Sequence, residues 1–219
     1  MLKIITIPVT LYEQNARILI DDSSKEAVIV DPGGDVPNIL AQLPNDVTLK
    51  AIWITHSHID HVSGVAALLN EFETGTIVIL AHAEDKINRD NLPLQSQMMQ
   101  FPYSGDFNTT TDVAHGDKIY CGQYQFKVLH TPGHAIGHVS FFCENRSNKY
   151  EAPICIAGDA LFRGSIGRTD LPGGNHQQLL DSIQSQLFSL PTETVIFSGH
   201  GLNTTVGEEI NHNPFFLDT

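Results

Sequence analysis

Thr55-His56-Ser57-His58-Ile59-Asp60-His61 is the stretch that decides the fold and the chemistry of this chain. Three of its eleven histidines and one carboxylate lie within these seven residues. A strand would place His56, His58 and Asp60 on one face and turn the last histidine away. A helix would align His56 with Asp60 but not with His58. The stretch is therefore predicted to be a loop whose side chains converge on a metal ion, rather than a polar turn with solvent-facing histidines.

Short apolar runs surround this loop and read as alternating strands and helices. Strands are predicted over residues 2–8, 16–20, 27–30, 49–54, 76–80, 118–121, 124–129, 138–143, 153–157 and 194–197. Helices are predicted over 36–43, 62–72, 84–90, 175–187 and 205–210, with a long loop over 92–112 that contains some helical turns. Both halves of the chain consist of short strands followed by helices. We therefore expect one domain, residues 1–219, of α/β class, in which two sheets pack together with helices outside.

Composition narrows the possible partners. The chain has 12 Lys and Arg against 25 Asp and Glu, a formal net charge of −13, so it lacks the basic surface that a nucleic-acid backbone requires. Its N-terminus lacks the apolar core of a signal peptide, and no apolar run is long enough to span a bilayer. The three separated cysteines read as reduced core residues. These features predict a cytoplasmic protein that acts on a small molecule, without nucleic-acid or membrane partners.

Three further polar residues stand at the ends of apolar strands, each directly after a glycine. They are His134 in Thr131-Pro-Gly-His, Asp159 in Ala157-Gly-Asp, and His200 in Ser198-Gly-His. Glycine lets the backbone turn tightly there, and loops at strand ends commonly carry functional residues. Any one of them alone would read as a turn residue. With the loop they make seven candidate ligands: His56, His58, Asp60, His61, His134, Asp159 and His200.

Seven donors exceed the needs of one tetrahedral ion and suit two divalent metals. Two neighbouring cations need a bridging anion, for which Asp159, arriving from elsewhere in the chain, is the candidate. The nitrogen and oxygen ligands are compatible with zinc, iron or manganese. Two such ions would generate a hydroxide nucleophile and polarise a carbonyl or phosphoryl oxygen, so metal-assisted hydrolysis is the expected chemistry.

These motifs, in this order and spacing, resemble the metallo-β-lactamase superfamily over nearly the whole chain. The resemblance implies a four-layer αβ/βα sandwich with its site at one edge between the sheets. It implies that one metal is bound by His56, His58 and His134, and the other by Asp60, His61 and His200. Asp159 would bridge the two ions, and Asp60 and Asp159 would be the catalytic carboxylates.

Leu161 to Gly174 and the segment from Gly199 to Thr205 are similar to the glyoxalase II group, in particular to its short bacterial members. That resemblance implies a hydroxyacylglutathione hydrolase-like enzyme of methylglyoxal detoxification. It would cleave S-lactoylglutathione to lactate and glutathione by attack of a metal-bound hydroxide. The C-terminal glutathione-binding helical domain of the two-domain members is not expected here. Arg168 stands where those members carry a lysine and is the candidate substrate-binding residue. Arg163 has two possible roles, in the site or as a structural partner of Asp170 or another carboxylate.

Several alternatives stay open at this stage. A persulfide dioxygenase shares the first motif but uses one iron bound by two histidines and an aspartate. A lactonase or a nuclease of the same fold, and a binding module without catalysis, are further possibilities. Asp31 is predicted to orient a ligand histidine, and His130 to be either an orienting residue or a structural one. The remaining histidines, including His82 and His138, are expected to be structural or solvent-facing.

Overall fold

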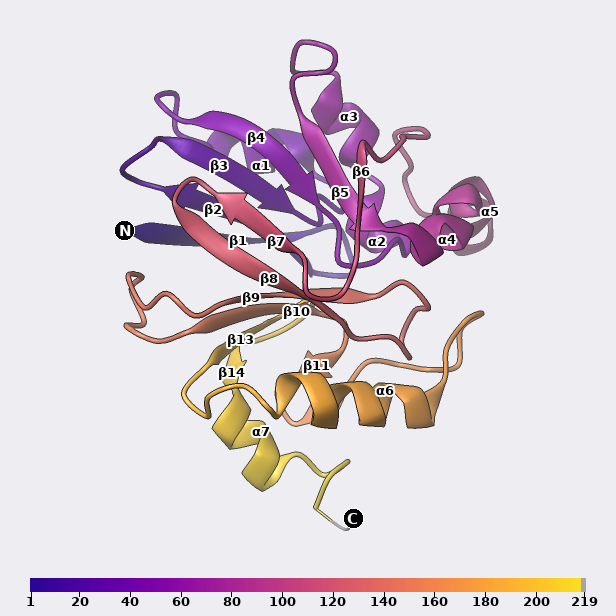
Figure 1. The fold of residues 1–219 in the computed structure, drawn as a ribbon. Coiled ribbons are helices and arrows are strands. Elements are labelled where there is room, and N and C mark those ends of the chain that lie inside the picture. Colours follow the sequence, from indigo (N-terminus) through magenta and orange to yellow (C-terminus); the bar gives the residue numbers. More distant parts are fainter. Residues whose placement is uncertain (218–219) are drawn as a thin grey trace.

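The computed structural model describes residues 1–217, and two six-stranded sheets form its centre (Figure 1). Sheet A contains β1 (Leu2–Val9), β2 (Gln14–Asp21), β3 (Glu26–Val30), β4 (Thr48–Trp53), β5 (Val78–His82) and β6 (Thr111–Val113), in that order. Sheet B runs β14 (Thr204–Thr205), β13 (Val195–Ser198), β10 (Ile154–Gly158), β9 (Val139–Cys143), β8 (Tyr124–His130) and β7 (Lys118–Cys121). A small hairpin joins β11 (Leu161–Phe162) to β12 (Ser165–Ile166).

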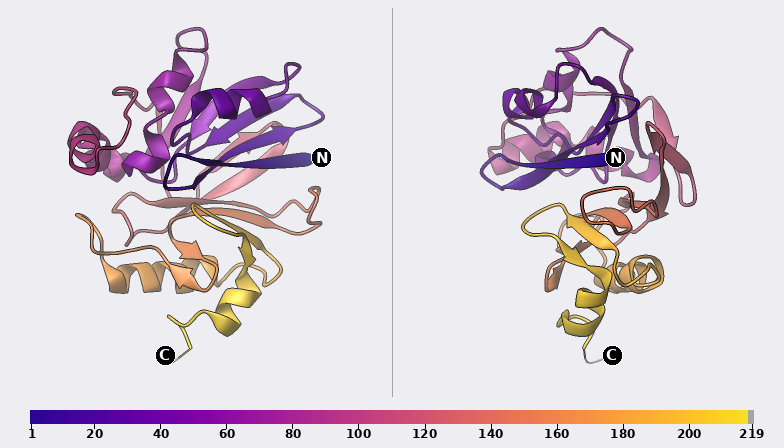
Figure 2. Two further views of the ribbon diagram at one scale, coloured as in Figure 1. Left: turned by 180° about the vertical axis from the view of Figure 1, so that it is seen from behind. Right: turned by 90° about the vertical axis from the view of Figure 1, so that its left-hand side faces the viewer.

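Helices cover the outer face of each sheet, as the two views of Figure 2 show. Beside sheet A lie α1 (Val36–Gln42), α2 (Ile59–Val62), α3 (Val65–Leu69), the 3-10 turn η1 (Ala83–Asp85), α4 (Lys86–Asp90) and α5 (Leu92–Met99). Beside sheet B lie α6 (His176–Ser182), its π-helical continuation η2 (Ile183–Leu187), and α7 (Val206–His212). Buried apolar residues form three clusters, one between the sheets and one under each helical layer. The predicted four-layer αβ/βα sandwich is thus confirmed.

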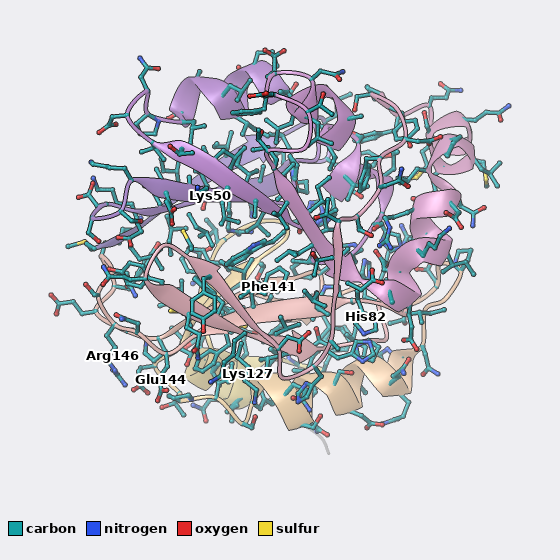
Figure 3. All side chains as sticks on the ribbon, turned by 45° about the horizontal axis from the view of Figure 1, so that its top comes forward. Lys50, His82, Lys127, Phe141, Glu144 and Arg146 are labelled. Atoms are coloured by element: carbon teal, nitrogen blue, oxygen red, sulfur yellow. The ribbon has the colours of Figure 1, made fainter. Side chains whose placement is uncertain are left out.

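Large aromatic side chains fill the space between the sheets. The ring of Trp53 on sheet A lies 5.1 Å from that of Phe126 and 5.3 Å from that of Phe141, both on sheet B. All three are fully buried, and Figure 3 shows Phe141 among the side chains between the sheets. Burying each of them stabilises the fold by roughly 2–3 kcal/mol, so this cluster holds the two sheets together.

The helix predicted over 62–72 is wrong in its bounds and continuity. The structure has α2 and α3 instead, separated at Ser63 and Gly64. The Gly64 amide donates to the Pro32 carbonyl, and a Cβ on Gly64 would lie 2.7 Å from that oxygen. The turn after β3 therefore packs directly against this point, and that contact interrupts the helix. The helical turns predicted within the loop over 92–112 correspond to α5, which begins with Pro93 in its first turn, where proline is compatible with a helix.

Parallel pairing brings several strand ends to one edge. β3, β4, β5 and β6 pair in parallel within sheet A, and β10 pairs in parallel with β13 within sheet B. The carboxyl ends of parallel strands meet at the same edge of a sheet, so the loops after β4, β10 and β13 emerge close together. Within residues 1–217, no helix is long and apolar enough to cross a lipid bilayer.

Candidate metal centre

The seven predicted ligands come from four loops at that edge. The loop after β4 carries His56 and His58, and α2 begins immediately afterwards with Asp60 and His61 in its only turn. His134, Asp159 and His200 follow β8, β10 and β13. The structure brings all seven side chains together, as two groups of three with Asp159 between them.

The first group consists of His56, His58 and His134. The Nε2 atom of His134 lies 3.1 Å from Nε2 of His56 and 2.9 Å from Nδ1 of His58. The second group consists of Asp60, His61 and His200. The Oδ2 atom of Asp60 lies 3.2 Å from Nε2 of His200 and 3.9 Å from Nε2 of His61. Each set can hold one metal ion.

Asp159 reaches both groups. Its Oδ1 lies 3.2 Å from His61 Nε2, and its Oδ2 lies 3.6 Å from His200 Nε2 and 3.7 Å from His134 Nε2. Oδ2 thus lies near both donor groups and Oδ1 near the second, and a bridging ligand must be a carboxylate that reaches both groups in this way. Asp159 therefore lies between the two donor groups, and its role as a bridging ligand stays a prediction.

Hydrogen bonds outside the centre set the orientation of three imidazoles. Nδ1 of His134 donates to the backbone carbonyl of Arg168 at 2.7 Å, and Nδ1 of His200 donates to that of Tyr12 at 3.0 Å. Nδ1 of His61 lies 3.0 Å from a carboxylate oxygen of Asp31. An Nδ1 proton held by an acceptor leaves the Nε2 lone pair free to bind a metal.

The first group is held in the neutral form that a metal ligand needs. Burial is the largest cause that lowers the pKa of His56, and the neighbouring histidines lower it further. Burial and His134 lower the pKa of His58 to about 3. Burial also lowers the pKa of His134, against the opposing effect of Asp159. All three imidazoles are therefore neutral at physiological pH and present lone pairs.

In the second group, the neighbouring carboxylates favour the protonated, positively charged form of His61. Burial lowers the pKa of His61, but Asp159, Asp60 and Asp31 outweigh it, so the net pKa is well above the usual value. Burial alone would raise the pKa of Asp159, but His61 and the neighbouring histidines lower it overall. Asp60 is shifted in the same direction against its burial, chiefly by His61 and His200. A site with two ionised carboxylates is one that a cation stabilises, and a bound metal can take the place of the His61 proton.

Unsatisfied polar atoms provide the direct test of fit. Among the described residues, His61 Nε2 and Asp159 Oδ1 are buried and have no hydrogen-bond partner, although they are 3.2 Å apart. Buried polar atoms are normally paired, because leaving one unpaired costs about 1–3 kcal/mol. A metal ion between them would satisfy both atoms, so the residues present fit a metal centre.

Several supporting residues were predicted only partly or not at all. Asp31 was predicted to orient a histidine, and it also accepts from the amide and hydroxyl of Thr55, which fixes the start of the loop. His138 was expected to be structural or exposed; it is fully buried, and its Nε2 accepts from the Asp159 amide at 3.1 Å. Its Nδ1 lies 2.8 Å from the Thr131 hydroxyl. His138 thus holds the backbone of Asp159, a role without any local sequence signal.

Arg17 is the supporting residue that sequence reasoning missed. It is 2% exposed, and its guanidinium donates to the backbone carbonyls of Asn15 and Ser198. The Asn15 amide group also donates to the Ser198 carbonyl and to that of Gly201. Burial lowers the pKa of Arg17 to about 10, partly offset by Asp31 and Asp159. Two β2 side chains therefore secure the loop that carries His200.

Five of the seven residues line an open cavity of about 410 Å³: His58, Asp60, His134, Asp159 and His200. His56 and His61 are fully buried behind them. Arg168 lies on its rim, but its guanidinium forms a two-point ion pair with Asp170, at 2.7 and 2.8 Å. Asp170 is therefore paired with Arg168. The interpretation in which Asp170 is the partner of Arg163 is wrong. Solvent screens an exposed ion pair of this kind and makes it weak, so a ligand carboxylate can compete for Arg168.

His82 and His130 lie outside this cavity. Their rings stack at 4.3 Å, and His130 Nε2 donates to the Ile136 carbonyl, so His130 supports the loop that carries His134. Figure 3 shows His82 at the end of β5. With Glu84 these histidines form a further, more exposed group of possible metal ligands. The structural interpretation of both histidines agrees with these contacts.

A first prediction concerns Asp31. In Asp31→Asn, one of the two carboxylate oxygens that accept from Thr55 and His61 becomes an amide donor. Losing a hydrogen bond that orients a ligand histidine typically costs 10–100-fold in metal affinity. We expect the Kd of the more weakly bound metal ion to be about 10–100-fold higher in the variant than in the parent protein. Competition with a chelator of known affinity measures this Kd. Unchanged affinity for both equivalents would show that Asp31 does not orient His61.

A second prediction concerns Asp85, which is buried beneath the loop near Ser57. Burial raises its pKa to about 6, against the effects of Ser57, Asn88 and Arg89. The folded chain therefore binds this proton more tightly than the unfolded chain does, whose ordinary value is 3.8, and stability falls as pH rises through that window. In Asp85→Asn that fall should disappear, and the variant should gain roughly 2–3 kcal/mol relative to the parent between pH 4 and pH 7.

Urea unfolding of both proteins across that pH range, with chelator present throughout, measures the difference. Asp181→Asn, an exposed carboxylate on α6, is the control and should track the parent protein. Parallel pH profiles for Asp85→Asn and the parent would contradict the prediction.

The fold and the donor set together define a metallo-hydrolase of the αβ/βα sandwich type. The family model for the metallo-beta-lactamase superfamily matches residues 14–200, and the chain belongs to that superfamily. It is 35% identical over 211 residues to hydroxyacylglutathione hydrolase GloC of Haemophilus influenzae, covering 95% of each chain.

Two solved structures extend the comparison. The chain superposes on the crystal structure of BLEG-1 B3 metallo-beta-lactamase with a TM-score of 0.86 and 35% identity, covering 98% of this chain and 99% of that one. It superposes on TTHA1623 in a di-iron-bound form with a TM-score of 0.83 and 31% identity, covering 96% and 99%. The resemblance seen in the motifs is therefore confirmed at the level of the superfamily.

Proposed function

We propose that this chain is a binuclear metal-dependent hydrolase that cleaves glutathione thioesters such as S-lactoylglutathione to a 2-hydroxy acid and glutathione. The observation that carries the proposal is the pair of donor groups, with Asp159 reaching both, beside an open cavity. The similarity to hydroxyacylglutathione hydrolase GloC supports the thioester as substrate. We assign His56, His58 and His134 to one metal, and Asp60, His61 and His200 to the other.

When bound, two divalent metals supply a nucleophile from water at neutral pH and polarise the carbonyl oxygen of the substrate. The chain supplies the ionised carboxylates of Asp60 and Asp159, whose pKa values are lowered, and the fixed imidazole orientations. Because Asp31 and the backbone carbonyls of Tyr12 and Arg168 hold the outer nitrogens, the inner ones need no reorganisation during the reaction. Arg168 stands at the rim, where it can meet a substrate carboxylate in place of Asp170.

Thiol release from S-lactoylglutathione tests the proposal. The purified protein is stripped with chelator, reloaded with zinc, iron or manganese in turn, and assayed alongside the stripped sample. We expect release with at least one metal at about two equivalents per chain, and none after stripping. A protein that binds two metals and releases no thiol under any loading contradicts the proposal.

Hydrolysis of β-lactams is the second candidate. It is favoured by the 35% identity to BLEG-1 B3 metallo-beta-lactamase over 98% of the chain. A chromogenic β-lactam assayed on the same metal-loaded samples decides between the two. We expect kcat/KM for the thioester to exceed that for the β-lactam, and the reverse order would favour the second candidate.

A further inference from the structure

The side chains that surround the candidate ligands are mostly apolar. Five elements contribute them: the turn after β1, the helix α2, the helix α5, the hairpin β11–β12, and the segment after β12. The apolar and aromatic members are Tyr12, Ile59, Met99, Phe162, Ile166 and Leu171. We refer to these six as the apolar wall.

Two members of the wall stand beside His200. The backbone carbonyl of Tyr12 accepts from this histidine, and the Phe162 ring lies 6.3 Å from the imidazole. The Tyr12 ring is held in turn by Phe101, at 5.0 Å between centroids. A substrate whose reacting carbonyl sits at the metal ligands therefore has apolar surfaces next to it. Burial of apolar ligand surface against such side chains is favourable in proportion to the area removed from water.

Three polar side chains of the cavity besides the candidate ligands, Gln95, Arg168 and Ser165, have partners within the chain. The Gln95 carbonyl oxygen accepts from the Ile59 amide, and its amide group donates to the Asn88 carbonyl. Arg168 is paired with Asp170, and the Ser165 hydroxyl lies 3.5 Å from the Ile166 carbonyl. A hydroxyl on an acyl group that packs against the apolar wall would lose its water without a hydrogen bond from these aliphatic and aromatic carbons, which is unfavourable.

We infer that the cavity selects thioesters whose acyl group is apolar, over those that carry a 2-hydroxyl. This inference rests on the proposed thioester hydrolysis and names the substrate class within it. The matched pair is 2-methylpropanoyl-glutathione and lactoyl-glutathione, which differ by a methyl group in place of a hydroxyl on the same carbon. The enzyme should prefer the first by about tenfold in kcat/KM.

Hydrolysis rates are compared after division by each ester's rate constant with hydroxide ion, because a 2-hydroxyl also alters the electrophilicity of the carbonyl. In the straight series from acetyl to hexanoyl glutathione, kcat/KM should rise about threefold for each methylene until the cavity is filled. Equal corrected values for the matched pair, or no rise along the series, would overturn the inference and leave thioester hydrolysis standing.

Binding of uncleavable S-alkylglutathione thioethers gives a readout that does not depend on turnover. Calorimetry on the metal-loaded protein, from S-methyl to S-hexyl, should show Kd falling about threefold per methylene, with a negative heat-capacity change. If these thioethers bind in that order and no thioester is hydrolysed, the proposed function fails while the apolar selectivity stands. If Kd does not vary with chain length, the inference fails.

Neighbouring methionines on α5 provide a matched pair of variants. Met99 lines the cavity, whereas Met98, 75% exposed, is not among its lining residues. Met99→Gln keeps the length of the side chain and makes it polar. It should therefore reduce the ratio of the Kd for S-methylglutathione to the Kd for S-hexylglutathione at least threefold. Met98→Gln should leave it unchanged. An equal response of the two variants would contradict the role of the apolar wall.

Discussion

Asp159→Asn is expected to lower kcat by about 10³-fold and to reduce the bound metal from two equivalents toward one. The carboxylate lies within 3.2–3.7 Å of three candidate ligand nitrogens, from both donor groups. An asparagine removes the negative charge that offsets the repulsion of two cations, and it turns one oxygen into a donor facing His61. Loss of one metal's contribution of several kcal/mol to the transition state corresponds to a rate factor of about 10³.

Metal analysis and thioester hydrolysis on one preparation measure both effects. Asp170→Asn is a useful comparison, because it removes an exposed carboxylate whose partner is Arg168, not a candidate ligand. Its metal content should match that of the parent. Retention of two tightly bound metals and near-parental kcat in Asp159→Asn would show that Asp159 does not join the two groups.

Gly199→Ala is expected to reduce activity about 10²-fold although it changes no ligand. A Cβ at this position would lie 1.9 Å from Asp159 Oδ1 and 2.8 Å from His61 Cε1. The backbone has little room to retreat, because the Gly199 amide donates to the Gly158 carbonyl and its own carbonyl accepts from Asn15, both at 2.7 Å. The carboxylate must therefore turn away, and a displacement of about 1 Å at a catalytic centre can cost 10²-fold.

Gly201→Ala is the matched control two residues further on. Among residues 1–217, its Cβ would meet no atom within 4 Å. Its φ of +68° costs a side-chain residue about 1 kcal/mol of stability, without displacing a ligand. Parental activity in Gly199→Ala, at full metal content, would mean that Asp159 has more freedom than these contacts allow.

Local sequence patterns predicted much of the fold because buried strands and amphipathic helices have recognisable periods. β7 was predicted with its observed bounds, and most other strands to within two residues. The strands β6, β11, β12 and β14, of only two or three residues each, were missed, because a period cannot be read from so short a run. The interruption between α2 and α3 was missed for another reason, since it depends on Pro32 packing against Gly64 from a different element.

The seven candidate ligands could be identified from the sequence alone because their chemistry is carried by the residue itself. Histidines and aspartates gathered in one loop, or placed after a glycine at the end of a strand, are visible without coordinates. The tertiary structure decided how they are used. Only the packing of the two sheets brings His138 to the Asp159 amide, Arg17 to the Ser198 carbonyl, and six apolar side chains to the rim of one cavity. These contacts join residues far apart in the chain, and no local pattern specifies which distant segments will meet.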